Sequence, residues 1–369
     1  MDRAEAKPSS PPVGAQRPAD YVRDRRIARV VPLLAPDALL VELPLSEKQA
    51  DVVVRGRSHV QAVLDREDDR LLVVVGPCSV HDPDAALSYA SRLSESSVDL
   101  EDDLVVVMRV YFEKPRTTTG WKGLINDPHL DGSGDVNEGL RMARKLLLEV
   151  LELGLPVGCE FLDPITPQYI ADAVSWGAIG ARTTESQIHR QLTSGLSMPV
   201  GFKNRTDGDV GVAVDAVRAA AVPHSFAGID VDGTPAILHT RGNPDCHVIL
   251  RGGREAPNYS ADSVGDAMSR LRRVGLPERV VVDASHDNSG KDHERQPTVV
   301  RDIADQIAAG NEGLVGVMLE SFILAGRQDL QRDQRPVYGQ SITDACMSWE
   351  TTVETLDELA AAVRVRRGG

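Results

Sequence analysis

The feature that most constrains the fold is a series of eight short, predominantly apolar runs, most of them separated by a segment with helical periodicity. Such runs are typical of strands covered on both faces, as in parallel sheets flanked by helices. The runs occupy residues 71–75, 104–108, 157–161, 178–181, 200–203, 248–250, 280–282 and 314–319. Eight of them in one chain predict an α/β fold with a single (β/α)8 TIM barrel, whose functional residues lie at the carboxyl ends of the strands.

The segments between these runs predict the helices of the barrel. Apolar residues recur at helical spacing in residues 85–92, 136–153, 167–175, 210–221, 260–274 and 297–309. A further helix from about Ser46 to Asp65 precedes the first strand, with Ser46 as a plausible N-cap. After the last strand we expect a loop that carries Asp344, followed by a final helix.

Two additions to the barrel are expected. Residues 1–20 are rich in Pro, Ala, Ser and charge, which predicts a disordered tail. Residues 21–45 contain apolar clusters broken by prolines, so we expect an extended arm with an interface or regulatory role. The catalytic barrel then spans residues 46–369, and an Asp-Gly turn between β-like runs predicts an inserted hairpin at about residues 225–243.

Composition excludes several function classes. The formal net charge of −14 argues against nonspecific binding of nucleic acid, which needs a basic face. No apolar run approaches the length of a membrane span, and the N-terminus lacks the apolar segment of a secretory signal. Four dispersed cysteines do not form a disulfide framework in a chain of 369 residues. A cytoplasmic protein is expected.

Four residues of metal-ligand type occur at separate strand ends: Cys78, His286, Glu320 and Asp344. A thiolate, an imidazole and two carboxylates suit a borderline divalent ion such as Mn, Fe, Co or Zn better than Mg or Ca. Each residue taken alone has an ordinary alternative, namely a buried structural thiol, a hydrogen-bonded loop histidine, or a carboxylate in a cap or ion pair. A closed ring would make strand ends 1, 7 and 8 neighbours, which favours a shared metal site.

Cations follow the strands in the same way. Arg109, Arg182, Lys203 and Arg251 directly abut apolar runs, and Lys114 lies a few residues beyond the second run. An unpaired charge at such a position would be costly, so an anionic ligand in the barrel mouth is expected to supply the partners. For the loop at residues 108–127 alone, a charged surface loop is an equally good interpretation.

Several motifs together resemble those of a known family. They are GPCSVHD, MRVYFEKPRTTTGWKGLINDPHLD, GARTTESQIHRQL, GFKNRTDG, CHVILRGG, DASHDNSGK, GVMLESF and SITDAC. This set resembles the type I 3-deoxy-D-arabino-heptulosonate 7-phosphate (DAHP) synthases, of the feedback-regulated class with an N-terminal arm, from about residue 24 to residue 367. The resemblance implies condensation of phosphoenolpyruvate with D-erythrose 4-phosphate and water, the first step of the shikimate pathway, which leads to the aromatic amino acids.

The resemblance also implies roles for individual residues. One divalent ion per subunit is expected on Cys78, His286, Glu320 and Asp344. Phosphoenolpyruvate is expected on Arg109, Lys114, Glu160, Arg182, Lys203 and Arg251, and erythrose 4-phosphate on Arg116 and Thr117. Lys114, His286 and Asp344 are expected to be catalytic, with Lys114 as proton donor or orienting charge. Asp163, Pro167, Gln168 and Ser197 match the region that binds an aromatic amino acid effector, in a homodimer or homotetramer.

The chain departs from the family pattern in two places. After Glu320 and Ser321 it has Phe322 and an AGRQ run, where some relatives carry a histidine and an acidic residue. Arg205 stands where the family commonly has glycine, and we expect its side chain to point to solvent. Two rival functions stay open at this point. One is the related synthase that uses arabinose 5-phosphate, against which the KPRTT block and the arm both argue. The other is a non-catalytic paralogue that senses an aromatic ligand, which would need none of the metal ligands.

Overall fold

The computed structural model describes residues 23–116, 120–330 and 334–368. The predicted disordered tail, residues 1–20, lies outside them. The chain divides into two units, Met1–Leu33 and Leu34–Gly369. In the first unit, the described residues include a turn in which the Ile27 amide donates to the Asp24 carbonyl at 3.0 Å.

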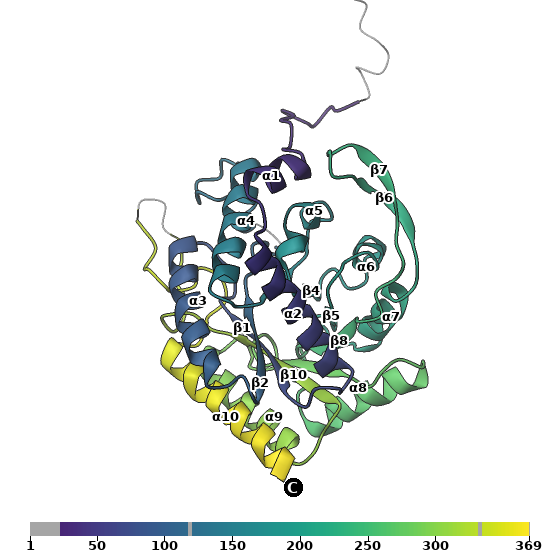
Figure 1. Cartoon of the computed structure of the whole chain (residues 1–369), viewed down its shortest axis with the longest axis vertical. Helices are drawn as coiled ribbons and strands as arrows, with labels where there is room; N and C mark the ends of the chain where they lie inside the picture. The colour runs from purple at the N-terminus through teal and green to yellow at the C-terminus, as the bar shows by residue number, and fades with distance from the viewer. Residues whose placement is uncertain (1–22, 117–119, 331–333, 369) are drawn as a thin grey trace, which may run out of the picture. The chain divides into compact units, whose positions relative to one another are not determined.

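Eight parallel strands close into a barrel in the ring order β1-β10-β9-β8-β5-β4-β3-β2 (Figure 1). The strands are β1 (Leu71–Gly76), β2 (Leu104–Arg109), β3 (Val157–Glu160), β4 (Trp176–Ile179), β5 (Val200–Lys203), β8 (His247–Leu250), β9 (Val280–Asp283) and β10 (Leu314–Glu320). Every residue of these strands is buried, as their apolar composition predicts. The predicted TIM barrel is confirmed, and the ends of β1, β9 and β10 are neighbours.

Helices surround the barrel and form its outer layer (Figure 1). They are α2 (Glu47–Leu64), α3 (Pro83–Val98), α4 (Val136–Glu152), α5 (Pro167–Ile170), α6 (Gln187–Thr193), α7 (Gly211–Ala220), α8 (Ala261–Arg273), α9 (Gln296–Ala308) and α10 (Trp349–Gly368). Short 3₁₀ turns occur at η2 (Ala171–Ala173) and η3 (His293–Arg295). The predicted N-cap of α2 is confirmed: Ser46 accepts from the Gln49 amide, and Gln49 accepts from the Ser46 amide.

The core has two parts because side chains alternate across each strand. Leu72, Val74, Val107 and Ile249 belong to the smaller buried cluster, together with Trp176. Their neighbours Leu71, Val73 and Val75 pack in the larger cluster, which also includes buried residues of the helices. The barrel interior is therefore filled by side chains, as in a packed core.

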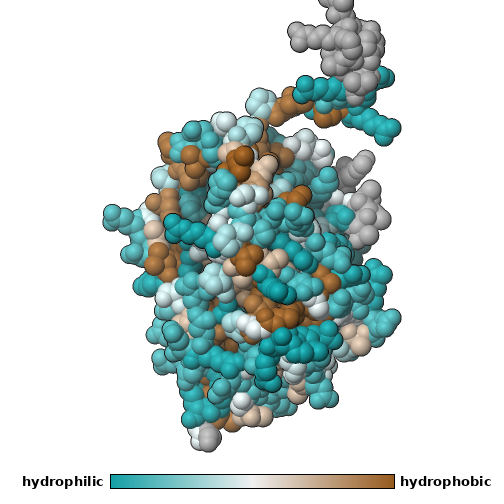
Figure 2. Space-filling model, turned by 90° about the vertical axis from the view of Figure 1, so that its right-hand side faces the viewer, coloured by the Kyte–Doolittle hydropathy of each residue, from teal (hydrophilic) through white to brown (hydrophobic). Residues whose placement is uncertain are grey.

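The inserted hairpin is also confirmed. Strands β6 (Ser225–Ile229) and β7 (Pro235–His239) pair antiparallel outside the barrel. Figure 2 shows one face of the molecule, on which small groups of hydrophobic side chains lie among hydrophilic ones. Within the described residues, no helix has the length and apolar character needed to span a membrane.

Some predicted elements were wrong in detail. Residues 36–42 of the predicted extended arm form a helix, α1 (Pro36–Glu42), because proline fits the first turn, where its missing N–H needs no partner. Strand β4 begins at Trp176, two residues before the predicted run. The predicted helix at residues 167–175 is only α5 and the η2 turn. Helix α6 was not predicted.

Candidate active site at the carboxyl end of the barrel

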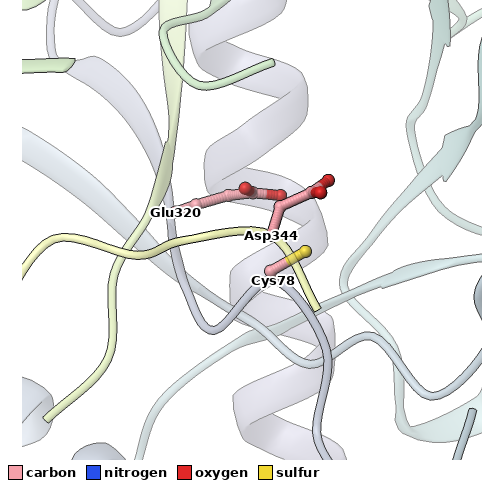
Figure 3. Close-up of side chains that lie close together, drawn as sticks. All are labelled: Cys78, Glu320 and Asp344. Atoms are coloured by element: carbon pink, nitrogen blue, oxygen red, sulfur yellow. The ribbon is translucent and has the colours of Figure 1, made fainter. Parts of the chain in front are cut away.

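Three of the four predicted metal ligands lie together. Cys78 follows β1, Glu320 ends β10, and Asp344 lies on the loop between β10 and α10 (Figure 3). One ligand atom of each lies within 4.8 Å of the others. Cys78 and Glu320 are buried, and Asp344 is partly buried. The ring order of the strands thus brings together residues separated by more than two hundred positions in sequence.

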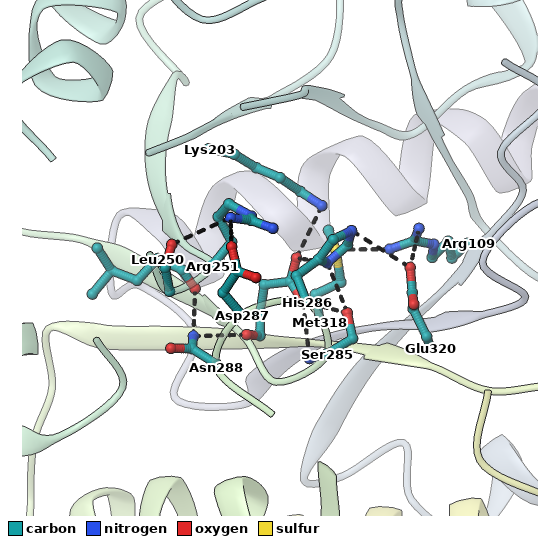
Figure 4. A network of polar contacts seen from close by, with 12 residues as sticks. Arg109, Lys203, Leu250, Arg251, Ser285, His286, Asp287, Asn288, Met318 and Glu320 are labelled. Atoms are coloured by element: carbon teal, nitrogen blue, oxygen red, sulfur yellow. Dashed lines mark hydrogen bonds and ion pairs between the residues drawn. The ribbon is translucent and has the colours of Figure 1, made fainter. Parts of the chain in front are cut away.

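His286, the fourth predicted ligand, lies beside this group. Its Nε2 is 3.7 Å from Glu320 Oε1, and its Nδ1 is 2.8 Å from Asp283 Oδ2 and 2.9 Å from Ser285 Oγ (Figure 4). Burial lowers the pKa of His286 despite the nearby Asp283 carboxylate, so the ring is neutral. A carboxylate on Nδ1 leaves Nε2 available, which is the usual arrangement of a metal-binding histidine.

The donor set fits a divalent metal ion. A sulfur, a nitrogen and two carboxylates within a few ångströms match the ligand types of Mn, Fe, Co and Zn sites. Burial raises the pKa of the Cys78 thiol and Glu320 adds to that effect, whereas Lys114 opposes it. A bound cation would oppose this rise and favour the thiolate, because coordination deprotonates a thiol.

Two cations contact the predicted ligands directly. Lys114 donates from Nζ to Cys78 Sγ at 3.0 Å, and Arg109 donates from Nη2 to Glu320 Oε1 at 2.7 Å. Burial alone would lower the pKa of Lys114, but Cys78 and Glu320 outweigh it and raise the pKa, so the ammonium stays charged. Arg109 is fully buried over the ring of Tyr111 and donates to the Pro77 and Cys78 carbonyls.

Two further cations pair with carboxylates at or just after the end of β9. Lys203 Nζ lies 2.9 Å from Asp283 Oδ2, and Arg251 pairs with Asp287 (Figure 4). His286 and Lys203 hold the pKa of Asp283 well below its ordinary value even though burial acts the other way. One carboxylate, Asp283, therefore orients both a predicted metal ligand and a predicted phosphate-binding lysine.

A cavity of about 110 Å³ opens above this network and is lined by most of the predicted residues. Lining residues are Lys114, Arg116, Glu160, Arg182, Lys203, Arg251, His286 and Asp344, together with Lys291, Thr206 and Thr343, which the sequence did not single out. Arg109 contacts Glu320 but does not line the cavity. Thr117 lies outside the described residues. Arg205 pairs with Glu185 and Asp207 at the surface, as expected.

Lys291 carries a signal of its own. It is a non-glycine residue with a φ of 62°, and its amide donates to the His286 carbonyl at 2.6 Å. A left-handed backbone at a bulky residue is uncommon and often marks a functional site. Its place in the loop after the seventh barrel strand could have identified it, since such loops form the mouth of a barrel.

The predicted effector region lies on a separate, larger cavity of about 980 Å³. Pro167, Gln168 and Ser197 line it, and Phe226 and Ile237 of the hairpin form part of its wall. Asp163 does not line it; its amide donates to Glu113 Oε1 at 3.1 Å. Three of the four predicted effector residues therefore share one cavity, and the fourth contacts the residue next to Lys114.

Comparisons with known proteins agree with this site. Residues 43–357 match the family model described as the DAHP synthetase I family. The chain belongs to the DAHP synthetase I family.

Relatives in this family cover nearly the whole chain. The Phe-sensitive phospho-2-dehydro-3-deoxyheptonate aldolase of Escherichia coli K12 is 55% identical over 345 residues, which are 94% of this chain and 98% of the relative. The corresponding protein of Corynebacterium glutamicum is 53% identical over 97% of this chain and 99% of its own, and a tyrosine-inhibited one of Schizosaccharomyces pombe is 51% identical over 96% and 97%.

A solved structure of the Francisella tularensis phospho-2-dehydro-3-deoxyheptonate aldolase aligns with a TM-score of 0.91 and 49% identity, over 93% of this chain and all of that one. This chain therefore shares its fold with that protein over most of its length.

Proposed function

We propose that this chain is a DAHP synthase that joins phosphoenolpyruvate to erythrose 4-phosphate, with water, and releases phosphate. The observation that carries the proposal is one cavity in which six Lys and Arg side chains surround two of the four metal-type ligands. Neither rival function is favoured, because the named relatives are aldolases of the heptonate product and the metal-type ligands are all present.

Phosphoenolpyruvate is proposed to bind on the cavity side of Arg182, Lys203 and Arg251. Guanidinium forks and an ammonium group match the oxygens of a phosphate and a carboxylate. Glu160 also lines the cavity, and its carboxylate offsets part of the positive charge of these three residues. Arg109 adds to the positive electrostatic potential of the cavity without lining it. Its ion pair with Glu320 neutralises part of its charge.

Lys114 is proposed to act between the two substrates. It lines the cavity, and its ammonium contacts the Cys78 sulfur. When C3 of phosphoenolpyruvate bonds to the aldehyde carbon, negative charge grows on the aldehyde oxygen and positive charge on C2. The charged Lys114 can donate a proton to that oxygen. Water then adds at C2, and phosphate leaves as its C–O bond breaks.

A divalent cation held by Cys78, His286, Glu320 and Asp344 would act as a Lewis acid toward the aldehyde oxygen. Asp344 is the partly buried member of the set, and Lys114, His286 and Lys291 keep its pKa low although burial opposes them. An ionised Asp344 facing the cavity can orient the water that adds at C2.

The test is phosphate release from phosphoenolpyruvate with erythrose 4-phosphate or arabinose 5-phosphate, with and without a chelator. We expect phosphate release with erythrose 4-phosphate and not with arabinose 5-phosphate. Chelation should abolish this release. His286→Ala should abolish metal-dependent turnover while phosphoenolpyruvate still binds in a calorimetric titration. Arg270→Gln, an exposed change on α8, is the control. Unchanged turnover in His286→Ala would contradict the assignment of His286 as a metal ligand.

Feedback by an aromatic amino acid is proposed at the 980 Å³ cavity between the α5 region and the hairpin. Relatives that are Phe-sensitive and tyrosine-inhibited support an effector of this class. Phe226, Leu192 and Leu196 offer apolar contacts, and Gln168 and Ser197 offer polar ones. Phe, Tyr and Trp should be added singly to the assay, and Gln168→Ala should weaken the inhibition seen. Inhibition unchanged in Gln168→Ala would refute the assignment of this cavity.

We also propose that the chain forms a homodimer or homotetramer in the cytoplasm. Val231 and Ile237 of the hairpin are 58% and 70% exposed, which suits burial against a second copy. The four cysteines are free and buried, as expected in a reducing compartment. Light scattering of the purified enzyme tests the assembly, and a monomer at micromolar concentration would contradict it.

A further inference from the structure

Arg109 connects the two chain segments that carry Cys78 and Glu320. Its Nε donates to the Pro77 carbonyl at 3.2 Å, and its Nη2 donates to the Cys78 carbonyl at 3.1 Å and to Glu320 Oε1 at 2.7 Å. Cys78 follows β1, whereas Glu320 ends β10. One guanidinium therefore holds two metal-type ligands at a fixed separation, and the precision of that separation depends on what holds the guanidinium.

The ring of Tyr111 covers one face of this guanidinium. Arg109 Cζ lies 3.9 Å from the centroid of the ring, and both residues are 0% exposed. Val107 and Tyr111 belong to the buried cluster of the barrel interior, and Arg109 lies between them in the same alternating register. A cation is attracted to the face of an aromatic ring, and the attraction is strongest where water is excluded from both groups.

The backbone fixes Tyr111 without help from Arg109. The Tyr111 carbonyl accepts from the Val80 amide at 2.9 Å, and the preceding Val110 amide donates to the Gly158 carbonyl at 2.8 Å. The chain thus continues the barrel past the end of β2, with hydrogen bonds to the neighbouring segments on both sides. Tyr111 is therefore a rigid support for the side chain that lies on it.

The hydroxyl of Tyr111 does not account for this arrangement. Among the residues that the structure describes, it has no hydrogen-bond partner. Burial raises the pKa of Tyr111 well above its ordinary value, although Arg109 opposes the rise, so the phenol is neutral and forms no ion pair. A buried hydroxyl without a partner costs stability. The contribution of Tyr111 is therefore the face of its ring, which phenylalanine would also supply.

We propose that Tyr111 is a positioning residue of the metal site: its ring fixes the guanidinium of Arg109, which in turn holds the Cys78 loop and the Glu320 carboxylate at the separation that a divalent cation requires. The inference rests on the proposed function, because it takes the metal-type ligands as a metal site, and it deepens that function by naming a residue behind the ligands. Tyr111 does not line the active-site cavity and takes no part in bond making.

The experiment titrates Co²⁺ into the full-length, chelator-treated enzyme and follows the absorption of the Co²⁺–thiolate bond, which reports the contact with Cys78. We expect Tyr111→Leu to lower the Co²⁺ affinity about tenfold and to weaken this absorption, as for the loss of an outer contact that orients a metal ligand. Tyr111→Phe should bind Co²⁺ as the parent does and unfold at a higher temperature, because it loses only the unpaired hydroxyl. Tyr111→Met should repeat the loss, and it decides the question if Tyr111→Leu does not fold.

Leu72→Ala is the matched control for lost core volume. Leu72 is buried in the same interior cluster, but it pairs with Val105 and Gly316 near the other end of the strands. Its Tm should fall because of the cavity, whereas its Co²⁺ affinity and absorption should equal those of the parent.

Equal Co²⁺ affinity in the parent and in the folded Leu or Met variant would overturn the inference. So would an equal loss in Leu72→Ala, which indicates general destabilisation, or in Tyr111→Phe, which indicates a role for the hydroxyl. If the parent neither binds Co²⁺ nor releases phosphate, the proposed function fails and this inference fails with it. If the parent does both and Tyr111→Leu matches it, only this inference fails.

Discussion

At the scale of single residues, Glu113 shows how burial controls charge beside the active site. Its carboxyl is 2% exposed and accepts hydrogen bonds from the Asp163 amide and the Thr166 hydroxyl. Burial raises its pKa to about 8, from an ordinary value of 4.5. Between these values the folded state binds a proton that the unfolded state does not, so the free energy of unfolding falls as pH rises through this window.

Glu113→Gln should remove this pH dependence. Between pH 6 and pH 8 we expect the variant to gain roughly 2 kcal/mol of unfolding free energy relative to the parent, measured by urea denaturation at both values. Glu255→Gln, a change of an exposed loop residue, is the matched control and should show no such gain. A constant difference between Glu113→Gln and the parent across this range would contradict the assignment.

Asp283 contacts both His286 and Lys203. Its substitution therefore tests whether it orients a metal-type ligand. Asp283→Asn removes the charge that orients the imidazole, and metal affinity should fall about ten- to a hundredfold in a titration with Co²⁺ or Mn²⁺. Asp287→Asn is the control, since Asp287 pairs with Arg251 and not with His286. Equal metal affinity in the two variants would show that Asp283 does not orient a ligand.

At the scale of elements, the loop after β2 is fixed by one glycine. Gly123 has a φ of +115°, and a Cβ there would lie 1.9 Å from the Phe112 carbonyl oxygen. The same loop is closed by a hydrogen bond from the Lys114 amide to the Lys122 carbonyl at 2.9 Å. Gly123→Ala must push the loop away from Phe112, so we expect kcat/KM to fall at least tenfold for a displacement of about 1 Å.

Gly132→Ala separates backbone strain from this contact. Gly132 also has a positive φ, of +76°, but a Cβ there would meet nothing within 4 Å. This variant should lose about 1 kcal/mol of stability and keep its kinetic constants. If both variants lose activity alike, the Phe112 contact does not hold the loop.

The predictability of each element follows from how its residues are buried. The run Val200–Lys203 matches its strand because each residue is covered on both sides, whereas β4 begins at Trp176, ahead of the predicted run, because Gly177 has no side chain to mark a strand. Helix α6 has the sequence QIHRQLT, and its Ile188 is 56% exposed, so no apolar stripe marks it. The metal-type ligands could be predicted because ring closure alone makes their strand ends neighbours. The complete burial of Arg109 could not be predicted, because it depends on packing against Tyr111.

At the scale of the whole molecule, the metal-type ligands connect the first and the last strand of the barrel. Cys78 follows the first strand, and Asp344 follows the last, so an ion bound to both would hold the closing seam between β1 and β10. Binding to the folded state alone stabilises by about 2.7 kcal/mol when the free metal is about a hundred times Kd. For a chain of 369 residues this corresponds to a rise in Tm of about 3–4 °C.

Calorimetric scans of chelator-treated enzyme, with and without Mn²⁺, Co²⁺ or Zn²⁺, measure that rise. Asp344→Asn should shrink it, because the loop after β10 then loses its charged ligand, and turnover should fall with it. Asp266→Asn, an exposed change on α8, should leave both the rise and the turnover as in the parent. An identical rise in Asp344→Asn would mean that the ion binds elsewhere, and the seam would then be held by the β1–β10 hydrogen bonds without it.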